Sequence, residues 1–206
     1  GMEKYTKHEH CQCPINIPRG QKPSPITLWL SSSVGKDSLY RDVPALGVYL
    51  ANSWRPDIQC YGGLTLPKRA DTYPFVVVDW PDGGVPYSQS VLPTLIALVE
   101  RYASHGPIEV GCVGGHGRTG TFAALIAVTL GVWGAEEAIN HVREDYCDRA
   151  IETYRQERAI YKYAGEQPPP PVYVAPKWNA PKGGDAKPQN SEDWDKNTYR
   201  FFRELG

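Results

Sequence analysis

The sequence predicts an α/β fold in which a central, mostly parallel sheet is flanked by helices. Apolar runs typical of strands alternate with stretches of helical periodicity between about residues 25 and 165. The elements follow the order strand, helix, strand, loop, helix, which is typical of parallel strands. The chain must return from the carboxyl end of one strand to the amino end of the next, and a helix usually makes this connection. The 206 residues are 41% hydrophobic, which is enough to bury one sizeable core.

Three segments are expected to be strands: residues 26–30, 75–80 and 108–112. The β-branched run at 75–80 is suited to burial on both faces of a sheet. Residues 45–51 fit either a helix or a strand, so their assignment stays open.

The first expected helix covers residues 88–102, where apolar side chains recur at helical spacing and Pro93 falls near the first turn, the place where a helix tolerates proline. An apolar helix follows over about residues 118–130, and Gly131 is well suited to end it. Two further helices are expected, over about residues 134–145 and 152–164.

Polar or proline-rich segments flank the predicted domain at residues 25–165. Residues 1–24 are expected to be a polar leader. Residues 166–206 form a Pro-rich tail that should run extended over the surface, as a plain linker or as a ligand for proline-reading domains around Pro170. Apolar residues recur at helical spacing near its end, so this end is expected either to dock as a helix or to trail free.

The composition argues against several classes of partner. With 22 basic and 23 acidic residues there is no excess of positive charge to bind nucleic acid or an anionic membrane. The longest apolar run, residues 122–133, is too short to cross a bilayer, and the first residues do not resemble a secretory signal. Five scattered cysteines fit a reducing compartment, so a cytoplasmic protein is expected.

The stretch GCVGGHGRTG, residues 111–120, follows the predicted strand at 108–112, and ligands of parallel sheets collect at the carboxyl ends of strands. Its glycines allow successive backbone N–H groups to point inward and form a nest for an anion. The next helix adds the positive end of its dipole, and Arg118 offers a planar fork for two oxygens. The stretch therefore predicts a phosphate site.

A thiol at the base of such a nest is a candidate nucleophile, because amide dipoles and an arginine favour the thiolate form of cysteine. Cys112 would face the phosphorus atom of a bound phosphate ester; the alternative is an inert buried thiol. The leaving oxygen needs a proton, and Asp82 lies in a glycine-containing loop just past the strand at 75–80. Asp79, at the end of that strand, is the less mobile alternative.

These residues resemble the motifs of the cysteine-dependent protein tyrosine phosphatases, and the chain is similar in size to the compact dual-specificity branch. The family has Cys, five residues, Arg and then Ser or Thr, which here run from Cys112 to Arg118 and Thr119. Its acid loop often reads Trp-Pro-Asp, as residues 80–82 do here. One position departs from the family: a histidine usually precedes the cysteine, and this chain has Gly111.

The resemblance implies that residues 25–165 are a phosphatase catalytic domain that needs no metal or cofactor. Cys112 would attack phosphorus and form a phosphocysteine, while Asp82 protonates the leaving oxygen and later acts as the base for water. Thr119 would hydrogen-bond the departing thiolate. The oxygens of the phosphoryl group would be held by Val113, Gly114, Gly115, His116, Gly117 and Arg118. The implied substrate is a protein or peptide carrying phosphotyrosine, with phosphoserine and phosphothreonine as further candidates.

Several assignments have a plain alternative. Gln156 resembles a glutamine that positions water in some members, or it lies on an exposed helix face. His116 contacts substrate or points to solvent, and Thr119 fits a helix-capping role as well as its catalytic one. Four side chains near the start are of types that can bind zinc: His8, His10, Cys11 and Cys13. We expect them to belong to the polar leader, and a metal site is the alternative.

Two other functions use the same loop. Gly111 motivates a catalytically silent phosphate-binding module, although such a module needs neither Cys112 nor Asp82. A phosphoinositide phosphatase or an RNA 5′-phosphatase would keep the chemistry and change the substrate. The loop has no lysine to favour a lipid headgroup, and the even charge balance provides no basic channel for RNA.

Overall fold

The computed structural model describes most of the predicted domain. The described residues are 13–19, 22, 24–32, 42–51, 60–61, 64–66, 70–86 and 88–171.

A five-stranded sheet forms the centre of the molecule, with strand order β1-β2-β7-β3-β6. Its strands are β1 (Cys13–Ile17), β2 (Ile26–Ser32), β7 (Ile108–Cys112), β3 (Leu46–Ala51) and β6 (Phe75–Asp79). The pairs β2–β7, β7–β3 and β3–β6 are parallel, and β1 is antiparallel to β2. The predicted mostly parallel sheet is confirmed. A separate antiparallel pair joins β4 (Cys60–Tyr61) to β5 (Leu64–Thr65).

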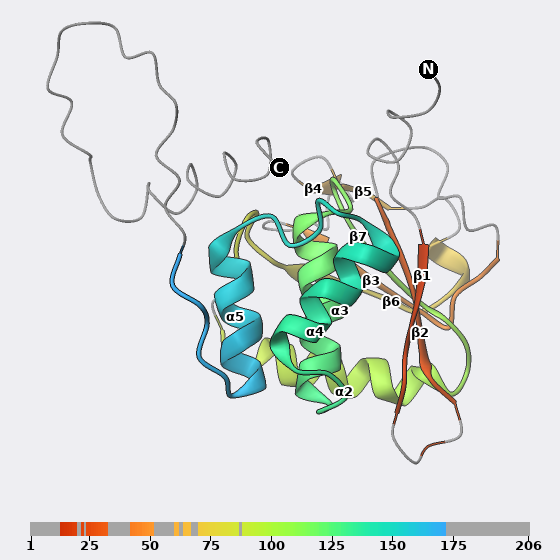
Figure 1. The fold of residues 1–206 in the computed structure, drawn as a ribbon. Coiled ribbons are helices and arrows are strands. Elements are labelled where there is room, and N and C mark those ends of the chain that lie inside the picture. Colours follow the sequence, from red (N-terminus) through yellow and green to blue (C-terminus); the bar gives the residue numbers. More distant parts are fainter. Residues whose placement is uncertain are drawn as a thin grey trace, which may run out of the picture.

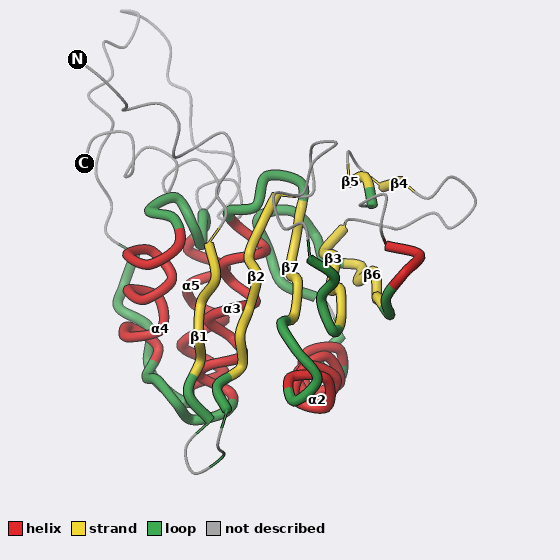
Figure 2. The backbone as a smooth tube through the Cα atoms, turned by 90° about the vertical axis from the view of Figure 1, so that its right-hand side faces the viewer, coloured by secondary structure: helices red, strands yellow, loops and turns green. Residues whose placement is uncertain are grey.

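Helices flank the sheet. The α-helices are α2 (Val91–Ala103), α3 (Gly117–Thr129), α4 (Ala135–His141) and α5 (Tyr154–Ala164); η1 (Ala70–Thr72) is a 3₁₀ turn and η2 (Val142–Tyr146) a π-helical turn. Figures 1 and 2 show α3, α4 and α5 together on one side of the sheet, while α2 packs across one end of it. In α3 every residue from Gly117 to Val128 is buried, so this helix runs through the core.

Local chemistry explains where the helices begin and end. Pro93 lies in the first turn of α2, as expected. Helix α3 ends at Thr129, and Gly131 follows with φ +68° and donates its N–H to the carbonyl of Val128. Thr153 caps α5 in a capping box with Gln156.

One strand settles an open assignment and another differs from expectation. Of residues 45–51, which the sequence left open, 46–51 form the fully buried strand β3 beside β7. The expected burial of residues 75–80 on both faces is wrong, because β6 lies at the edge of the sheet and Phe75 and Asp79 are exposed. A run of β-branched residues indicates that a segment prefers to form a strand. It does not indicate whether that strand lies at the edge or in the middle of the sheet.

Other differences concern element boundaries. The helix expected over 134–145 is α4 followed by the π-helical turn η2. Strand β1 lies inside the segment assigned to the leader: Ile15 and Ile17 are buried while Pro14 and Asn16 are exposed, an alternation too short to stand out in the sequence. His8, His10, Cys11 and the tail beyond residue 171 lie outside the described residues, and the boundaries of the predicted domain stay predictions.

The sheet register brings the proposed site together. Cys112, the last residue of β7, lies between Ser32 of β2 and Leu50 of β3. Trp80, just past β6, donates its backbone N–H to the carbonyl of Ala51 at 2.7 Å. The carboxyl ends of these parallel strands therefore share one edge, where open α/β sheets hold ligands. Within the described part of the chain no helix is long and apolar enough to cross a membrane.

Candidate active site

The turn from β7 into α3, residues 112–118, is called the phosphate loop here. Gly115 has φ +72°, a conformation that residues with a side chain rarely adopt. A Cβ at this position would lie 2.7 Å from the backbone nitrogen of Ser32, so the loop packs directly against the end of β2. Glycine is therefore required at this position for two independent reasons.

Three carbonyl groups of the phosphate loop are bound by groups that lie outside the loop. Ser32 Oγ donates to the carbonyl of Val113 at 2.7 Å, and the Tyr146 hydroxyl donates to the carbonyl of Gly115. The carbonyl of His116 accepts from the backbone N–H groups of Gly120 and Ile151. Because N–H and C=O point in opposite directions across a trans peptide, the N–H groups that follow these carbonyls point away from those partners. Amides turned to one side in this way are what the predicted anion nest requires.

Cys112 lies at the base of this loop. The residue is 2% exposed, and its Sγ accepts a hydrogen bond from the N–H of Gly115 at 3.2 Å. The thiol predicted from the sequence therefore lies at the start of the phosphate loop and contacts one of its amides.

Arg118, in the first turn of α3, joins the phosphate loop to the loop after β6. It is 6% exposed, and its Nη1 donates to the carbonyl of Trp80 at 3.4 Å. Its Nε lies 3.7 Å from Oδ1 of Asp82. The cysteine, arginine and acid that the sequence separates are thus brought to one place. Asp79, the alternative acid, is the exposed last residue of β6.

Residues 80–84 are called the acid loop here, and a buried tryptophan anchors them. The Trp80 ring is fully buried edge-on against Phe122, with centroids 5.8 Å apart, and its Nε1 donates to the carbonyl of Gly84 at 2.7 Å. The side chain of Asp82, by contrast, is 77% exposed. The loop therefore has a fixed base and presents its carboxylate toward open solvent beside Arg118.

Among the described residues, two polar side chains of the site are fully buried and have an atom without a hydrogen-bond partner: Oγ1 of Thr119 and Nε2 of Gln156. Thr119 therefore makes no capping hydrogen bond. Gln156 accepts from the N–H groups of Glu152 and Thr153, and its Nε2 lies 3.1 Å from where a Cβ of Gly117 would be. The alternative of an exposed helix face is wrong for Gln156, because the residue turns toward the phosphate loop.

His116 is half-buried on the phosphate loop. Its Nδ1 lies 3.2 Å from the buried Sγ of Cys147, and this hydrogen bond raises the pKa of the imidazole against the opposing effect of burial. The sequence gives no reason to assign Cys147 a role at the site, because it lies 31 residues after His116 and belongs to no motif. Ser32 and Tyr146 also belong to no motif, and they contact the phosphate loop only in the folded structure.

Gly111, the position where the family usually has histidine, faces an aromatic side chain. A Cβ at Gly111 would lie 3.6 Å from Cδ1 of Tyr49, its partner across β3 and β7. The Tyr49 hydroxyl donates to the buried carboxylate of Glu109 at 2.6 Å and contacts the Tyr73 hydroxyl, and burial together with Glu109 raises its pKa. The space next to the strand is thus filled by a tyrosine from β3.

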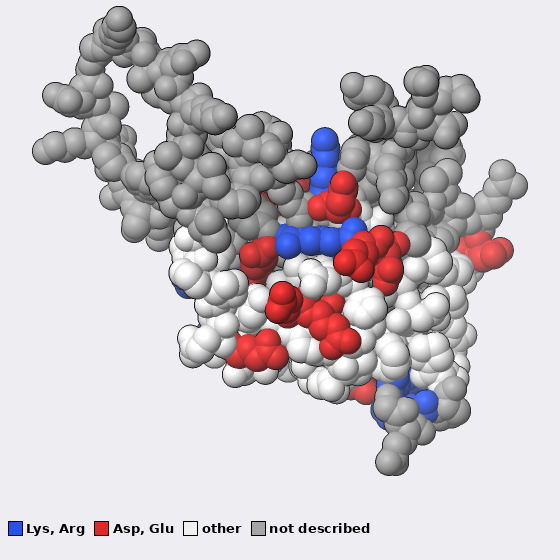
Figure 3. Space-filling model, viewed as in Figure 1, with Lys and Arg blue, Asp and Glu red and all other residues white. Residues whose placement is uncertain are grey.

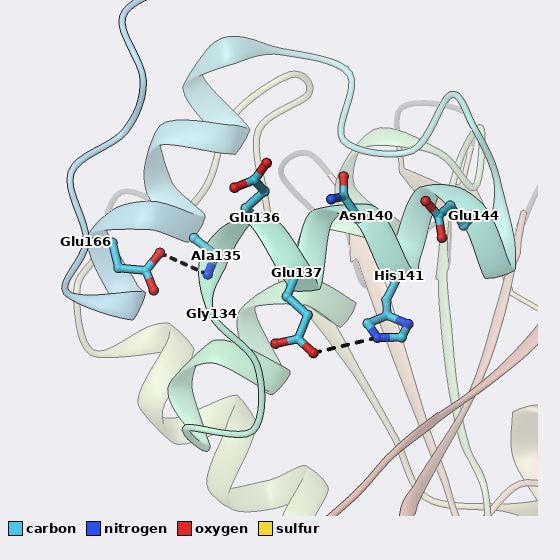
Figure 4. A pocket seen from close by; sticks show the side chains of 8 residues that line it. All are labelled: Gly134, Ala135, Glu136, Glu137, Asn140, His141, Glu144 and Glu166. Atoms are coloured by element: carbon cyan, nitrogen blue, oxygen red, sulfur yellow. Dashed lines mark hydrogen bonds and ion pairs between the residues drawn. The ribbon is translucent and has the colours of Figure 1, made fainter.

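A hollow lies away from the phosphate loop, on the face that carries α4. Figure 3 shows acidic side chains gathered on this face, and Figure 4 shows those of Glu136, Glu137, Glu144 and Glu166 around the hollow. His141 also lines it and lies 4.0 Å from Glu137. Within the described ranges no group of three or more His, Cys, Asp or Glu residues is arranged to hold a metal ion.

Comparison with known proteins identifies relatives of this region. Residues 63–160 match the family model described as protein-tyrosine phosphatase. An uncharacterized protein, MJECL20, of Methanocaldococcus jannaschii is 36% identical over 91 residues, which cover 44% of this chain and 59% of that protein. Tyrosine-protein phosphatase 2 of Dictyostelium discoideum is 35% identical over 78 residues, 35% of this chain and 21% of its own length.

The fold has solved counterparts as well. The crystal structure of Tk-PTP in its active form aligns with a TM-score of 0.53 at 21% identity, covering 67% of this chain and 91% of that one. At this identity the likeness shows the fold alone. The chain spans less than two thirds of the length of the two curated proteins described above.

Proposed function

Because residues 63–160 of this chain belong to the cysteine-dependent protein tyrosine phosphatase superfamily, we propose that the protein hydrolyses phosphotyrosine in phosphorylated proteins through a phosphocysteine intermediate. Phosphoserine and phosphothreonine are the further substrates that a compact, dual-specificity type of site would accept. The observation that carries this proposal is the meeting of Cys112, Arg118 and Asp82 at one edge of the sheet.

In the first step the phosphoryl oxygens bind in the nest of N–H groups and along the guanidinium of Arg118. The Cys112 thiolate attacks phosphorus, the S–P bond forms and the bond to the substrate oxygen breaks. Asp82 gives its proton to the departing phenoxide. The amides and the arginine stabilise the charge that develops on the equatorial oxygens, which is the main contribution of such a site.

In the second step water attacks the phosphocysteine and Asp82, now ionised, accepts a proton from it. The S–P bond breaks, and the thiolate returns to its hydrogen bond with Gly115. Thr119 is suited to donate to this sulfur, because its buried Oγ1 has no other partner. The buried Nε2 of Gln156, also without a partner and close to Gly117, is suited to hold the water.

The test is hydrolysis of para-nitrophenyl phosphate by the full chain in the presence of a chelator. We expect turnover that vanadate inhibits, and loss of turnover in Cys112→Ser at unchanged thermal stability. Turnover that persists in Cys112→Ser would rule the proposal out. Binding of a phosphotyrosine peptide without turnover at any pH would instead point to a silent binding module. Matched peptides carrying phosphotyrosine, phosphoserine or phosphothreonine would define the specificity.

A further inference from the structure

A threonine outside both catalytic motifs contacts the acid loop. Thr153 Oγ1 donates a hydrogen bond of 2.6 Å to the carbonyl of Gly83, the residue that follows Asp82. We infer that Thr153 is a positioning residue that holds the acid loop closed over the phosphate loop. This inference rests on the proposed role of Asp82 as the general acid.

The fit between Thr153 and the acid loop involves more than the hydroxyl group. Gly83 has φ +68°, and a Cβ at this position would lie 3.3 Å from Cγ2 of Thr153. The methyl group of the threonine therefore packs against the backbone at the same residue whose carbonyl the hydroxyl binds. One side chain thus fixes both the position and the orientation of the peptide next to the acid.

Thr153 is itself held rigidly. It is the N-cap of α5, where its Oγ1 accepts the backbone N–H of Gln156 at 3.2 Å while its own N–H donates to Oε1 of Gln156. A hydroxyl has one hydrogen to donate and lone pairs to accept, so it can cap the helix and bind Gly83 together. Gln156 is fully buried and lies against Gly117. A continuous path of contacts therefore joins the phosphate loop, the start of α5 and the acid loop.

The acid loop is anchored on both sides of Asp82 by Trp80, whose ring is fully buried and whose Nε1 donates to the carbonyl of Gly84 at 2.7 Å. Neither contact binds the peptide next to the acid. Asp82 itself is 77% exposed and lies 3.7 Å from Arg118, and an ion pair this exposed holds a loop only weakly. A general acid must stay within hydrogen-bond reach of the leaving oxygen. The hydroxyl of Thr153 adds a restraint from outside the loop, on Gly83, the residue directly after the acid.

The consequence is specific to the step that uses the acid. A phenoxide that leaves poorly depends on protonation more than an activated nitrophenoxide does. Loss of the contact would therefore slow the hydrolysis of phenyl phosphate and of phosphotyrosine, and leave that of para-nitrophenyl phosphate nearly unchanged. A mere loss of stability would slow all three substrates alike.

Three variants of the full chain separate the contact with Gly83 from the capping of α5. Thr153→Val keeps the shape but neither donates nor accepts. Thr153→Asp keeps a strong N-cap acceptor and, when ionised, has no proton to give to Gly83. Thr153→Ser keeps the donor and the acceptor, loses only the methyl group that packs against Gly83, and serves as the rescue control. Thermal unfolding reports the cap, and kcat/KM over a series of aryl phosphates reports the acid.

We expect Thr153→Val and Thr153→Asp to lower kcat/KM for phenyl phosphate by about tenfold to a hundredfold, with less than about a threefold change for para-nitrophenyl phosphate. Thr153→Ser, which lacks only the methyl contact, should stay within about threefold of the wild type for both substrates. The inference is overturned if Thr153→Asp, still stably folded, shows the wild-type dependence on the leaving group. An inactive wild type, or an active Cys112→Ser, would instead count against the proposed function.

Discussion

At the scale of single residues, the candidate site contains polar groups that are buried and incompletely hydrogen-bonded. Thr119 is fully buried, and its Oγ1 has no hydrogen-bond partner in the described part of the chain. Burying such a hydroxyl costs free energy that an apolar group of the same shape would not cost. In the proposed mechanism this cost in stability is offset in function, because the hydroxyl would donate to the sulfur of Cys112 during turnover.

Thr119→Val is therefore expected to leave the free energy of unfolding unchanged or raise it by up to about 1 kcal/mol, while it slows the second step of the reaction. The phosphocysteine should accumulate, so a burst of nitrophenol should precede a steady rate that is lower than in the wild type. Urea unfolding and rapid-mixing kinetics measure the two effects. A clear loss of stability, with the steady rate unchanged, would contradict this role.

His116 gives a prediction of pH dependence. Its pKa is raised above the usual 6.5, first by the hydrogen bond to Cys147; Glu152 also raises it, while burial and Arg149 lower it. A group whose pKa is higher in the folded state than in the unfolded state stabilises the fold at pH values below the unfolded pKa, which is 6.5 for histidine. This stabilisation is lost as the pH rises through the higher pKa of the folded state.

Accordingly, NMR titration of the full chain should give His116 a pKa above 6.5 in the wild type and a lower one in Cys147→Ala. The difference in unfolding free energy between wild type and His116→Asn should shrink as the pH rises past neutrality. An imidazole that titrates identically in Cys147→Ala would show that the thiol does not set its charge.

At the scale of elements, two glycines near the site differ in what they require. Gly111 lies in β7, and an added Cβ would make ordinary contacts of 3.5 Å or more. Gly120 lies in α3, and an added Cβ would approach Cβ of Ala150 to 2.6 Å, a contact that no side-chain rotation can relieve. Helix α3 and the segment before α5 thus pack directly on this glycine.

Gly120→Ala should therefore lower the free energy of unfolding by about 1–3 kcal/mol, because the segment at Ala150 must move. Gly111→Ala should be neutral or stabilise by up to about 1 kcal/mol, because alanine restricts the unfolded chain and fits the strand. Chemical denaturation of the two variants in parallel is the measurement. Equal effects of the two substitutions would show that the packing at α3 is looser than the contacts indicate.

Elements with a strong local signal could be predicted from the sequence, and those that depend on neighbours could not. The strand before Cys112 and the glycine that follows α3 were predicted correctly because their own residues dictate them. The edge position of β6 and the short strand β1 depend on which strands pair, and this is a property of the assembled sheet.

At the scale of the whole molecule, the sheet brings together segments that the sequence keeps apart. The motif residues at 80–82 and 112–119 could be found from their spacing and chemistry, and the structure brings Arg118 and Asp82 to 3.7 Å. The residues that support them carry no motif. Ser32, Tyr146 and Thr153 reach the two loops through tertiary contacts alone, so a single sequence gives no sign of their roles.

The central claim is that Cys112 carries the phosphoryl group during turnover, and trapping this intermediate tests it most directly. The full chain is mixed with para-nitrophenyl phosphate, quenched within the first turnover and analysed by mass spectrometry of its peptides. We predict the added mass of one phosphoryl group on the peptide that contains Cys112, and no such mass in Cys112→Ser. Turnover with no phosphorylated Cys112 peptide, or with the phosphoryl group on another residue, would contradict the account.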